Sequence, residues 1–212
     1  GIIVDGGNFD WIKDRKRQPL LNEPDQSYGG AVWADAVPQL TGANIPFVIR
    51  LRVVLLRDLG APLSPFNAFQ IIQGLETVGL RMKQHCSNAE KVVSFLETQK
   101  KVTNVIYPTN HQGEIKERAK KYMQGGYGSL VGMDVGTKEN GAKFIDNLKM
   151  LYHVANIGDA RSLAIHPATT THSQLNDKEL LAAGVTPGYV RLSIGIEHPD
   201  DIIADIKQAL AA

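Results

Sequence analysis

An arginine interrupts an otherwise apolar strand pattern towards the end of the sequence. In GYVRLSIGIE, residues 188–197, every second position is apolar, which predicts a β-strand with one buried face. The positions that form this face are Val190, Leu192, Ile194 and Ile196. Arg191 lies on the opposite face, where a charge in the middle of a strand is unusual.

Two interpretations of Arg191 follow from this pattern. If its face of the strand is exposed, Arg191 is an ordinary surface residue. If that face is covered, the guanidinium needs a partner, because an unpaired buried charge costs several kcal/mol. The sequence places no acid on that face nearer than Glu197. A ligand carboxylate then fits best, since the guanidinium fork donates two parallel hydrogen bonds to two oxygens.

A second candidate region, residues 153–175, runs from a predicted strand into a loop rich in hydroxyl and imidazole groups. These groups belong to Ser162, His166, Thr169, Thr170, Thr171, His172 and Ser173. Polar loops at the end of a strand often bind ligands. The same groups could instead cap turns and satisfy the backbone, so both interpretations stay open.

Other familiar chemistries are disfavoured by spacing. Gly126 and Gly128 are followed by Gly132, one residue off the dinucleotide-binding fingerprint, and a strand follows rather than a helix. His166 and His172 are six residues apart, and no helix or strand aims both at one metal. The sequence has no Gly-x-Ser-x-Gly elbow. The one cysteine, Cys86, falls in a helical apolar pattern and is predicted to be a buried structural thiol.

Composition narrows the protein class further. The 212 residues carry a formal charge of +1 and are 43% hydrophobic, as in an ordinary globular protein. No Lys/Arg cluster is interleaved with aromatic residues, which disfavours nucleic-acid binding. The longest apolar run is far below the roughly 20 residues of a membrane span. A single cysteine excludes an internal disulfide framework and fits a reducing cytoplasm.

The elements that position these residues can be predicted from periodicity. Residues 5–50 are punctuated by Gly and Pro and are expected to form a long loop. Residues 64–98 predict one helix of about 35 residues with a bend near Gly74 and Gly79. Strands are then expected at 101–108, 127–135, 152–157 and 189–197, and helices at 139–151, 176–184 and 199–212. This order predicts an α/β domain with a mostly antiparallel sheet.

The opening segment, GIIVDGGNFDW, reads as a short apolar run that meets a Gly-Gly turn. It has neither an initiator methionine nor a signal peptide. We therefore expect the chain to be the C-terminal portion of a longer protein.

Three long motifs carry a family resemblance that covers nearly the whole chain. They are LRDLGAPLSPFNAFQIIQGLETVGLRMKQHCSNAEKV, NIGDARSLAIHPATTTHSQL and YVRLSIGIEHPDDIIADI. Together they resemble the Cys/Met-metabolism group of pyridoxal-phosphate (PLP) enzymes, and within it the O-acetylhomoserine sulfhydrylase branch. The opening segment is similar to the part of these enzymes that follows shortly after the lysine carrying PLP.

The resemblance implies a fold and a division of the chain. The fold is the C-terminal portion of a fold-type I PLP-dependent transferase. Residues 1–78 would be the end of the large PLP-binding domain, with a long loop and the start of the connecting helix. Residues 79–212 would be the small domain, on the side of the substrate carboxylate.

The resemblance also implies site residues. Arg191 matches the arginine that binds the substrate α-carboxylate, and Asn156 matches a position that helps to hold it. Related γ-lyases typically have serine at the position of Asn156. Ser162 and Thr169 to His172 belong to a family motif, with no direct role assigned. The Schiff-base lysine is expected before Gly1, so no catalytic residue is assigned in this chain, nor any cofactor-binding or metal-binding residue.

The implied reaction is a PLP-dependent γ-replacement. O-acetyl-L-homoserine and sulfide, or a thiol, would give L-homocysteine, or methionine, and acetate. A homotetramer built from two dimers is implied, with the N-terminal half of the enzyme as partner, and the chain alone would be inactive. The alternatives are a methionine or cystathionine γ-lyase of the same family, and a non-catalytic partner chain without the PLP lysine.

Overall fold

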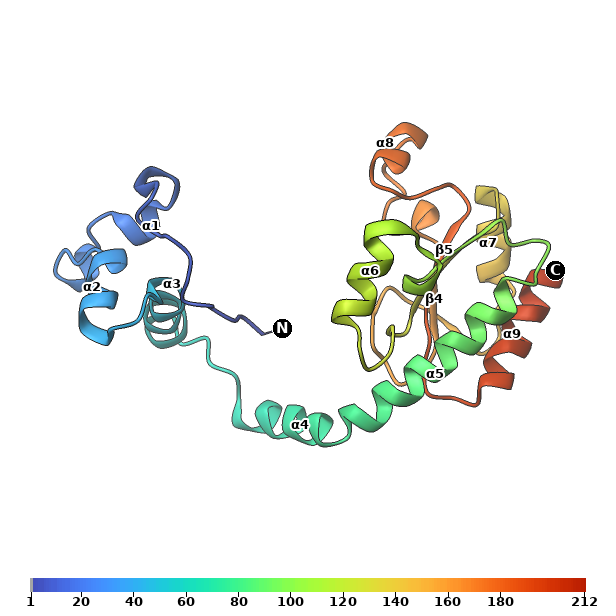
Figure 1. Ribbon diagram of the computed structural model, residues 1–212, viewed down its shortest axis with the longest axis horizontal. Coiled ribbons are helices and arrows are strands. Elements are labelled where there is room, and N and C mark those ends of the chain that lie inside the picture. Colours follow the sequence, from blue (N-terminus) through green and yellow to red (C-terminus); the bar gives the residue numbers. More distant parts are fainter. Residues whose placement is uncertain (1) are drawn as a thin grey trace. The chain divides into compact units, whose positions relative to one another are not determined.

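A computed structural model describes residues 2–212, and Gly1 lies outside the described residues. The chain packs as two units, one ending at Ile71 and one spanning Ile72–Ala212 (Figure 1). The functional division expected between residues 78 and 79 stays a prediction.

The first unit consists mainly of short helices. These are α1 (Pro19–Asn22), α2 (Trp33–Thr41), α3 (Pro46–Arg50), the 3₁₀ turns η1 (Arg15–Arg17) and η2 (Gln26–Tyr28), and the π-helical η3 (Leu51–Asp58). The expectation of one long loop over residues 5–50 is therefore wrong. Pro19 and Pro46, which suggest loops in the sequence, occupy the first positions of α1 and α3. Proline is favoured there because the first helical N–H has no partner within the helix.

Aromatic residues hold this unit together. Trp33 is buried, and its indole N–H donates to the Asp25 carboxylate at 2.9 Å. Trp11 and Tyr28 pack against the same cluster, and the Tyr28 ring meets the Trp33 ring edge-on at 4.8 Å between centroids. These side chains form the small core of the unit.

The single helix expected over residues 64–98 is divided into α4 (Pro65–Glu76) and α5 (Val78–Leu96). Thr77 separates them, between the two glycines that predicted a bend. Cys86 lies in α5 and is buried, as predicted. A side chain at Gly126 would come within 2.7 Å of the Cys86 sulfur, so the thiol is tightly enclosed by the chain.

The second unit is built around a five-stranded sheet in the order β1-β2-β5-β4-β3. Its strands are β1 (Asn104–Ile106), β2 (Leu130–Asp134), β3 (Tyr152–His153), β4 (Leu163–Ile165) and β5 (Tyr189–Ser193). Its helices, besides α5, are α6 (Gly113–Tyr122), α7 (Lys138–Asp146), α8 (Asp177–Ala182) and α9 (Pro199–Ala211), with 3₁₀ turns η4 (Pro108–Asn110) and η5 (Pro167–Thr169). All strand pairs are antiparallel except β3 with β4.

One face of this sheet is covered by helices. Helices α5, α7 and α9 gather along it (Figure 1) and share a single core with the strands. Val190 and Leu192 of β5 pair with Met133 and Val131 of β2, and all four side chains are completely buried in this core. Because side chains alternate along a strand, Arg191 projects from the opposite face.

The sequence did not predict β4 or α6. All three residues of β4, Leu163 to Ile165, are buried, so the strand lacks the alternation that marks one buried face. Ile196, expected to be buried in the last strand, is 37% exposed because β5 ends at Ser193.

No single helix among residues 2–212 is long and apolar enough to cross a membrane. Helix α2 and the helical stretch Pro46–Asp58 are together long and apolar enough, by length and composition only, but they are bent by 101° relative to each other.

A candidate carboxylate-binding site

Arg191 lies in the middle strand of the sheet. Its register partners are Gly132 on β2 and Ile165 on β4, so ordered backbone flanks it on both sides. The side chain is partly buried. The structure therefore places Arg191 between the two interpretations that its sequence pattern left open: the residue is neither fully exposed nor fully enclosed.

The guanidinium of Arg191 has more donors than partners. Its Nη2 donates to the carbonyl oxygen of Ala155 at 2.6 Å. Its Nε is buried without a hydrogen-bond partner among the described residues. No carboxylate within residues 2–212 lies within 4.0 Å of it. Since an arginine carries five N–H donors, this side chain has spare capacity for an anion.

Tyr189 lies beside Arg191 on the same face of β5. Its ring covers Gly132, where an added Cβ would come within 2.7 Å of the Tyr189 ring. Burial raises the pKa of the Tyr189 phenol, and the nearby Arg191 charge opposes that rise. The glycine therefore makes room for an aromatic wall next to the guanidinium. The strand alternation could have identified Tyr189, because it lies two residues before Arg191 on the same face.

Asn156 lies in the segment that joins β3 to β4. The residue is exposed and directly follows Ala155, whose carbonyl accepts the Arg191 hydrogen bond. The backbone contact thus brings the segment that carries Asn156 to the guanidinium. The proposed roles of Arg191 and Asn156 in binding a substrate are predictions that this geometry permits.

The hydroxyl-rich loop is engaged in internal contacts. Thr169 Oγ1 lies 2.9 Å from Nδ1 of His166, and the Thr170 hydroxyl donates to the His166 carbonyl at 2.8 Å. His166 Nε2 lies 2.8 Å from the Pro187 carbonyl oxygen, and burial lowers the pKa of the imidazole. For these residues the structure supports the interpretation that they stabilise turns. Ser162 is also internally bonded, to the Glu197 carboxylate.

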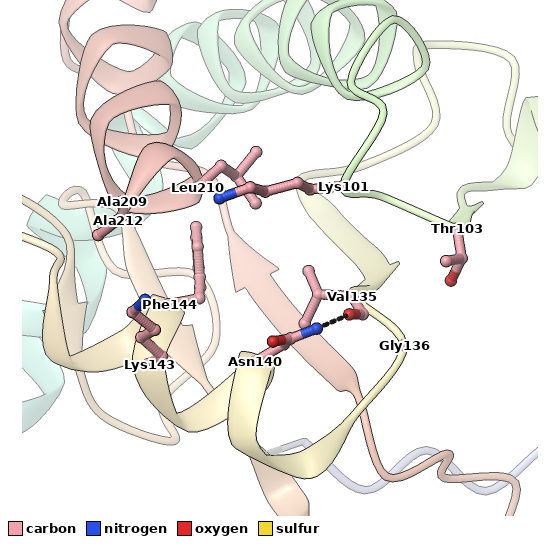
Figure 2. A pocket seen from close by; sticks show the side chains of 10 residues that line it. All are labelled: Lys101, Thr103, Val135, Gly136, Asn140, Lys143, Phe144, Ala209, Leu210 and Ala212. Carbon is pink, nitrogen blue, oxygen red and sulfur yellow. Dashed lines mark hydrogen bonds between the residues drawn. The ribbon is translucent and has the colours of Figure 1, made fainter.

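A separate cavity lies elsewhere in the second unit. Its volume is ≈ 380 Å³, and Val135, Phe144, Lys101 and Lys143 are among the residues that line it (Figure 2). Neither Arg191 nor Asn156 lines it. This cavity is therefore separate from the candidate site.

The sequence comparison decides the family. The pattern of the family described as "Cys/Met metabolism PLP-dependent enzyme" matches residues 1–211. The chain belongs to this family.

Relatives within the Cys/Met-metabolism family carry consistent names. An O-acetyl-L-homoserine sulfhydrylase of Leptospira meyeri is 47% identical over 99% of this chain and 48% of its own length. A homocysteine synthase of Schizosaccharomyces pombe is 43% identical over 99% of this chain and 48% of its own. The chain thus spans about half the length of the curated relatives it matches.

A solved structure shares the fold. It is a putative O-acetylhomoserine (thiol)-lyase of Campylobacter jejuni, 40% identical, with a TM-score of 0.79 over 95% of this chain and 47% of that one. The crystal structure contains a pyridoxyl-lysine phosphate group. The α/β fold expected from the resemblance is confirmed.

The family's cofactor is pyridoxal phosphate. The unused donors of Arg191 fit a carboxylate group, such as that of an amino acid. No contact to the cofactor ring, phosphate or imine is assigned to a residue of this chain.

Proposed function

We propose that this chain forms part of a PLP-dependent γ-replacement enzyme. Its substrates are O-acetyl-L-homoserine and sulfide, or a small thiol, and its products are L-homocysteine, or methionine, and acetate. The observation that carries the proposal is the partly buried Arg191, whose Nε has no hydrogen-bond partner within residues 2–212, in a chain of this family. The names of the relatives support this choice of substrate.

The contribution of this chain is to hold the substrate. Arg191 binds the α-carboxylate through its remaining donors, because a guanidinium matches a carboxylate with two parallel hydrogen bonds. Asn156, next to the backbone carbonyl that Arg191 contacts, contributes a side-chain amide to the same carboxylate. A carboxylate fixed at two points cannot rotate freely, so the bonds to the α- and β-carbons are held in the orientation the reaction needs.

The remaining functions belong to the part of the enzyme outside this chain. PLP, when bound, withdraws electrons from the substrate and so makes its α- and β-protons removable. We assign the Schiff-base lysine and the cofactor contacts to the half that precedes Gly1. We further propose that the whole enzyme is a cytoplasmic homotetramer composed of two dimers.

Asn156 distinguishes two reactions within the family. The related γ-lyases typically carry serine at this position, and asparagine in the NIGD motif resembles the sulfhydrylases. The sulfhydrylase reaction is therefore preferred over methionine or cystathionine γ-lyase activity.

A product assay on the full-length PLP-loaded enzyme tests the proposal. With O-acetyl-L-homoserine and sulfide we expect homocysteine and acetate in equal amounts, and no homocysteine when sulfide is omitted. With methionine alone we expect no methanethiol. Methanethiol from methionine, without homocysteine in the first reaction, would identify a γ-lyase instead. Failure of both reactions would favour a non-catalytic chain.

A further inference from the structure

The segment between β3 and β4, residues 154–162, is tied to one neighbouring strand at several points. We call this segment the carboxylate loop, since it carries Asn156. Arg191 donates to the Ala155 carbonyl, and the Gly158 N–H donates to the Ser193 hydroxyl at 3.3 Å. Further along, the Ile196 N–H donates to the Ala160 carbonyl at 2.8 Å. The loop therefore follows β5 and its continuation from Arg191 to Ile196.

The strongest contact between this loop and the rest of the protein is made by the carboxylate of Glu197. Oε1 of Glu197 accepts the backbone N–H of Ser162 at 2.6 Å, and Oε2 accepts the Ser162 hydroxyl at 2.9 Å. The same hydroxyl oxygen accepts the Gly195 N–H at 2.9 Å. One carboxylate thus clamps the end of the carboxylate loop with two charge-assisted hydrogen bonds, which are stronger than neutral ones.

The clamp leaves no space for a side chain at Gly195. A Cβ there would lie 2.2 Å from Oε2 of Glu197 and 2.5 Å from both the Ala160 carbonyl oxygen and the Ser162 nitrogen. Real Cβ atoms essentially never approach heavy atoms this closely. The tight fit shows that loop, carboxylate and strand continuation are packed as one piece.

The chain that carries Glu197 is itself anchored. The Asn88 amide of α5 donates to the carbonyls of Gly195 at 3.0 Å and Glu197 at 2.8 Å. Nδ1 of His85, also in α5, lies 2.6 Å from the Ile194 carbonyl oxygen. Both side chains are buried. A rigid path of hydrogen bonds therefore runs from α5 through residues 194–197 and Glu197 to the carboxylate loop.

We propose that Glu197 is a positioning residue for substrate binding, acting through Ser162 and the carboxylate loop. By clamping the loop at Ser162, Glu197 holds the Ala155 carbonyl against Arg191 and holds Asn156 beside it. The guanidinium is thereby fixed in one direction before the substrate arrives, which lowers the entropy lost on binding. This inference rests on the proposed function, because it assumes that Arg191 binds the substrate carboxylate.

The test uses Glu197→Gln in the full-length PLP-loaded enzyme. The amide keeps the size of the side chain but loses the charge and turns one acceptor into a donor facing the Ser162 hydroxyl. We expect the KM for O-acetyl-L-homoserine to rise about tenfold, or about 1.4 kcal/mol, with the KM for sulfide and the absorbance of bound PLP unchanged. Glu114→Gln, at an exposed i,i+4 pair with Arg118, is the matched control and should change neither KM.

Combining Glu197→Gln with Arg191→Ala tests the positioning role of Glu197 separately from the proposed function. In the Arg191→Ala background, we expect Glu197→Gln to change the KM less than twofold, since the group it positions is gone. An undiminished tenfold effect in that background would overturn the positioning role and leave the proposed function intact. An unchanged KM in Arg191→Ala itself would instead overturn the carboxylate role of Arg191, and with it the proposed function.

A milder variant covers the case in which Glu197→Gln fails to fold. Ser162→Ala removes the hydroxyl contact to Glu197 but keeps the backbone contact at Oε1. We expect about a threefold rise in the KM for O-acetyl-L-homoserine, with the KM for sulfide unchanged. An equal rise in both KM values would indicate general loss of structure and would contradict the inference.

Discussion

Arg191 is a charged side chain in the middle strand of a sheet, and its surroundings do not neutralise it. Its buried Nε lacks a partner within residues 2–212. An unsatisfied buried donor costs about 1–3 kcal/mol of folding stability, more when the group is charged. A residue that weakens the fold in the absence of a ligand is typical of a functional site.

At the residue scale, Arg191→Leu separates function from stability. In the full-length enzyme we expect kcat/KM for O-acetyl-L-homoserine to fall about a hundredfold or more, corresponding to a loss of about 3 kcal/mol in substrate interaction. Thermal unfolding should shift little or upward, because the unsatisfied donor is removed. The absorbance of bound PLP should persist.

The exposed Arg118, on α6, provides the matched control. Arg118→Leu should leave kcat/KM within about twofold, because exposed ion pairs contribute about 0–1 kcal/mol. Wild-type activity in Arg191→Leu would refute the carboxylate role. A loss of PLP absorbance would contradict the assignment of the cofactor contacts to the other half of the enzyme.

The sequence could single out Arg191 but not its immediate surroundings. The alternation of residues 190, 192 and 194 is enough to assign the two faces of β5, and these three side chains are completely buried. The contact with Ala155 could not be predicted, because it depends on the path of an irregular loop. The clamp at Ser162 was missed for the same reason, although Glu197 was recognised as the nearest acid on that face.

At the element scale, the predictions succeed where a period is sustained and fail where it is short. Helix α9 begins at Pro199, as its acidic first turn predicts, and Asn176 caps α8 with a capping box. Strand β4 has only three residues, all buried, and pairs in parallel with β3. A parallel pair requires a crossover between its strands, so the position of β4 depends on the tertiary fold.

Sequence periodicity also does not explain Asp205, an acidic residue on the buried side of α9. Asp205 accepts the backbone N–H groups of Lys149, Met150 and Leu151 at 2.9, 2.9 and 3.0 Å. The Gln208 amide donates to it at 2.9 Å. Burial by itself raises the pKa of this carboxyl, but the donors together outweigh burial, so its pKa lies below the usual value.

Asp205 is therefore expected to make folding stability depend on pH. A carboxyl with a folded pKa below its unfolded pKa stabilises the protein above the unfolded value of about 3.9, and this stabilisation is lost as pH falls through the folded pKa. Asp205→Asn should lower the free energy of unfolding by about 2 kcal/mol at neutral pH. Its difference from wild type should stay constant at about pH 6–8 and shrink below about pH 4.

Thermal unfolding of the full-length enzyme at several pH values measures this effect. Asp200→Asn is the control, because Asp200 is exposed in the first turn of the same helix. It should cost less than about 0.5 kcal/mol. Equal destabilisation by the two variants would show that the backbone contacts of Asp205 contribute nothing.

At the scale of the whole molecule, the chain carries a helix that it does not bury. Helix α4 has no buried residue, and it exposes Phe66, Phe69, Ile71, Ile72 and Leu75. An apolar patch of this kind usually marks a surface that another part of an assembly covers. The chain also spans about half the length of its relatives. Both observations support the proposal that activity needs the other half of the enzyme.

The last prediction concerns the 212-residue chain produced alone. Its family is PLP-dependent, and we propose that the lysine that binds PLP lies outside this chain. After incubation with PLP and gel filtration, we expect no retained cofactor absorbance and no homocysteine from O-acetyl-L-homoserine and sulfide. A dye that fluoresces on apolar surfaces should bind the chain alone more strongly than the full-length enzyme, because α4 is exposed.

The full-length enzyme, assayed in parallel, should retain PLP and convert the two substrates to homocysteine. Homocysteine formation by the 212 residues above the level in buffer would show that this chain contains its own reactive group and would overturn the division of labour proposed for the two halves.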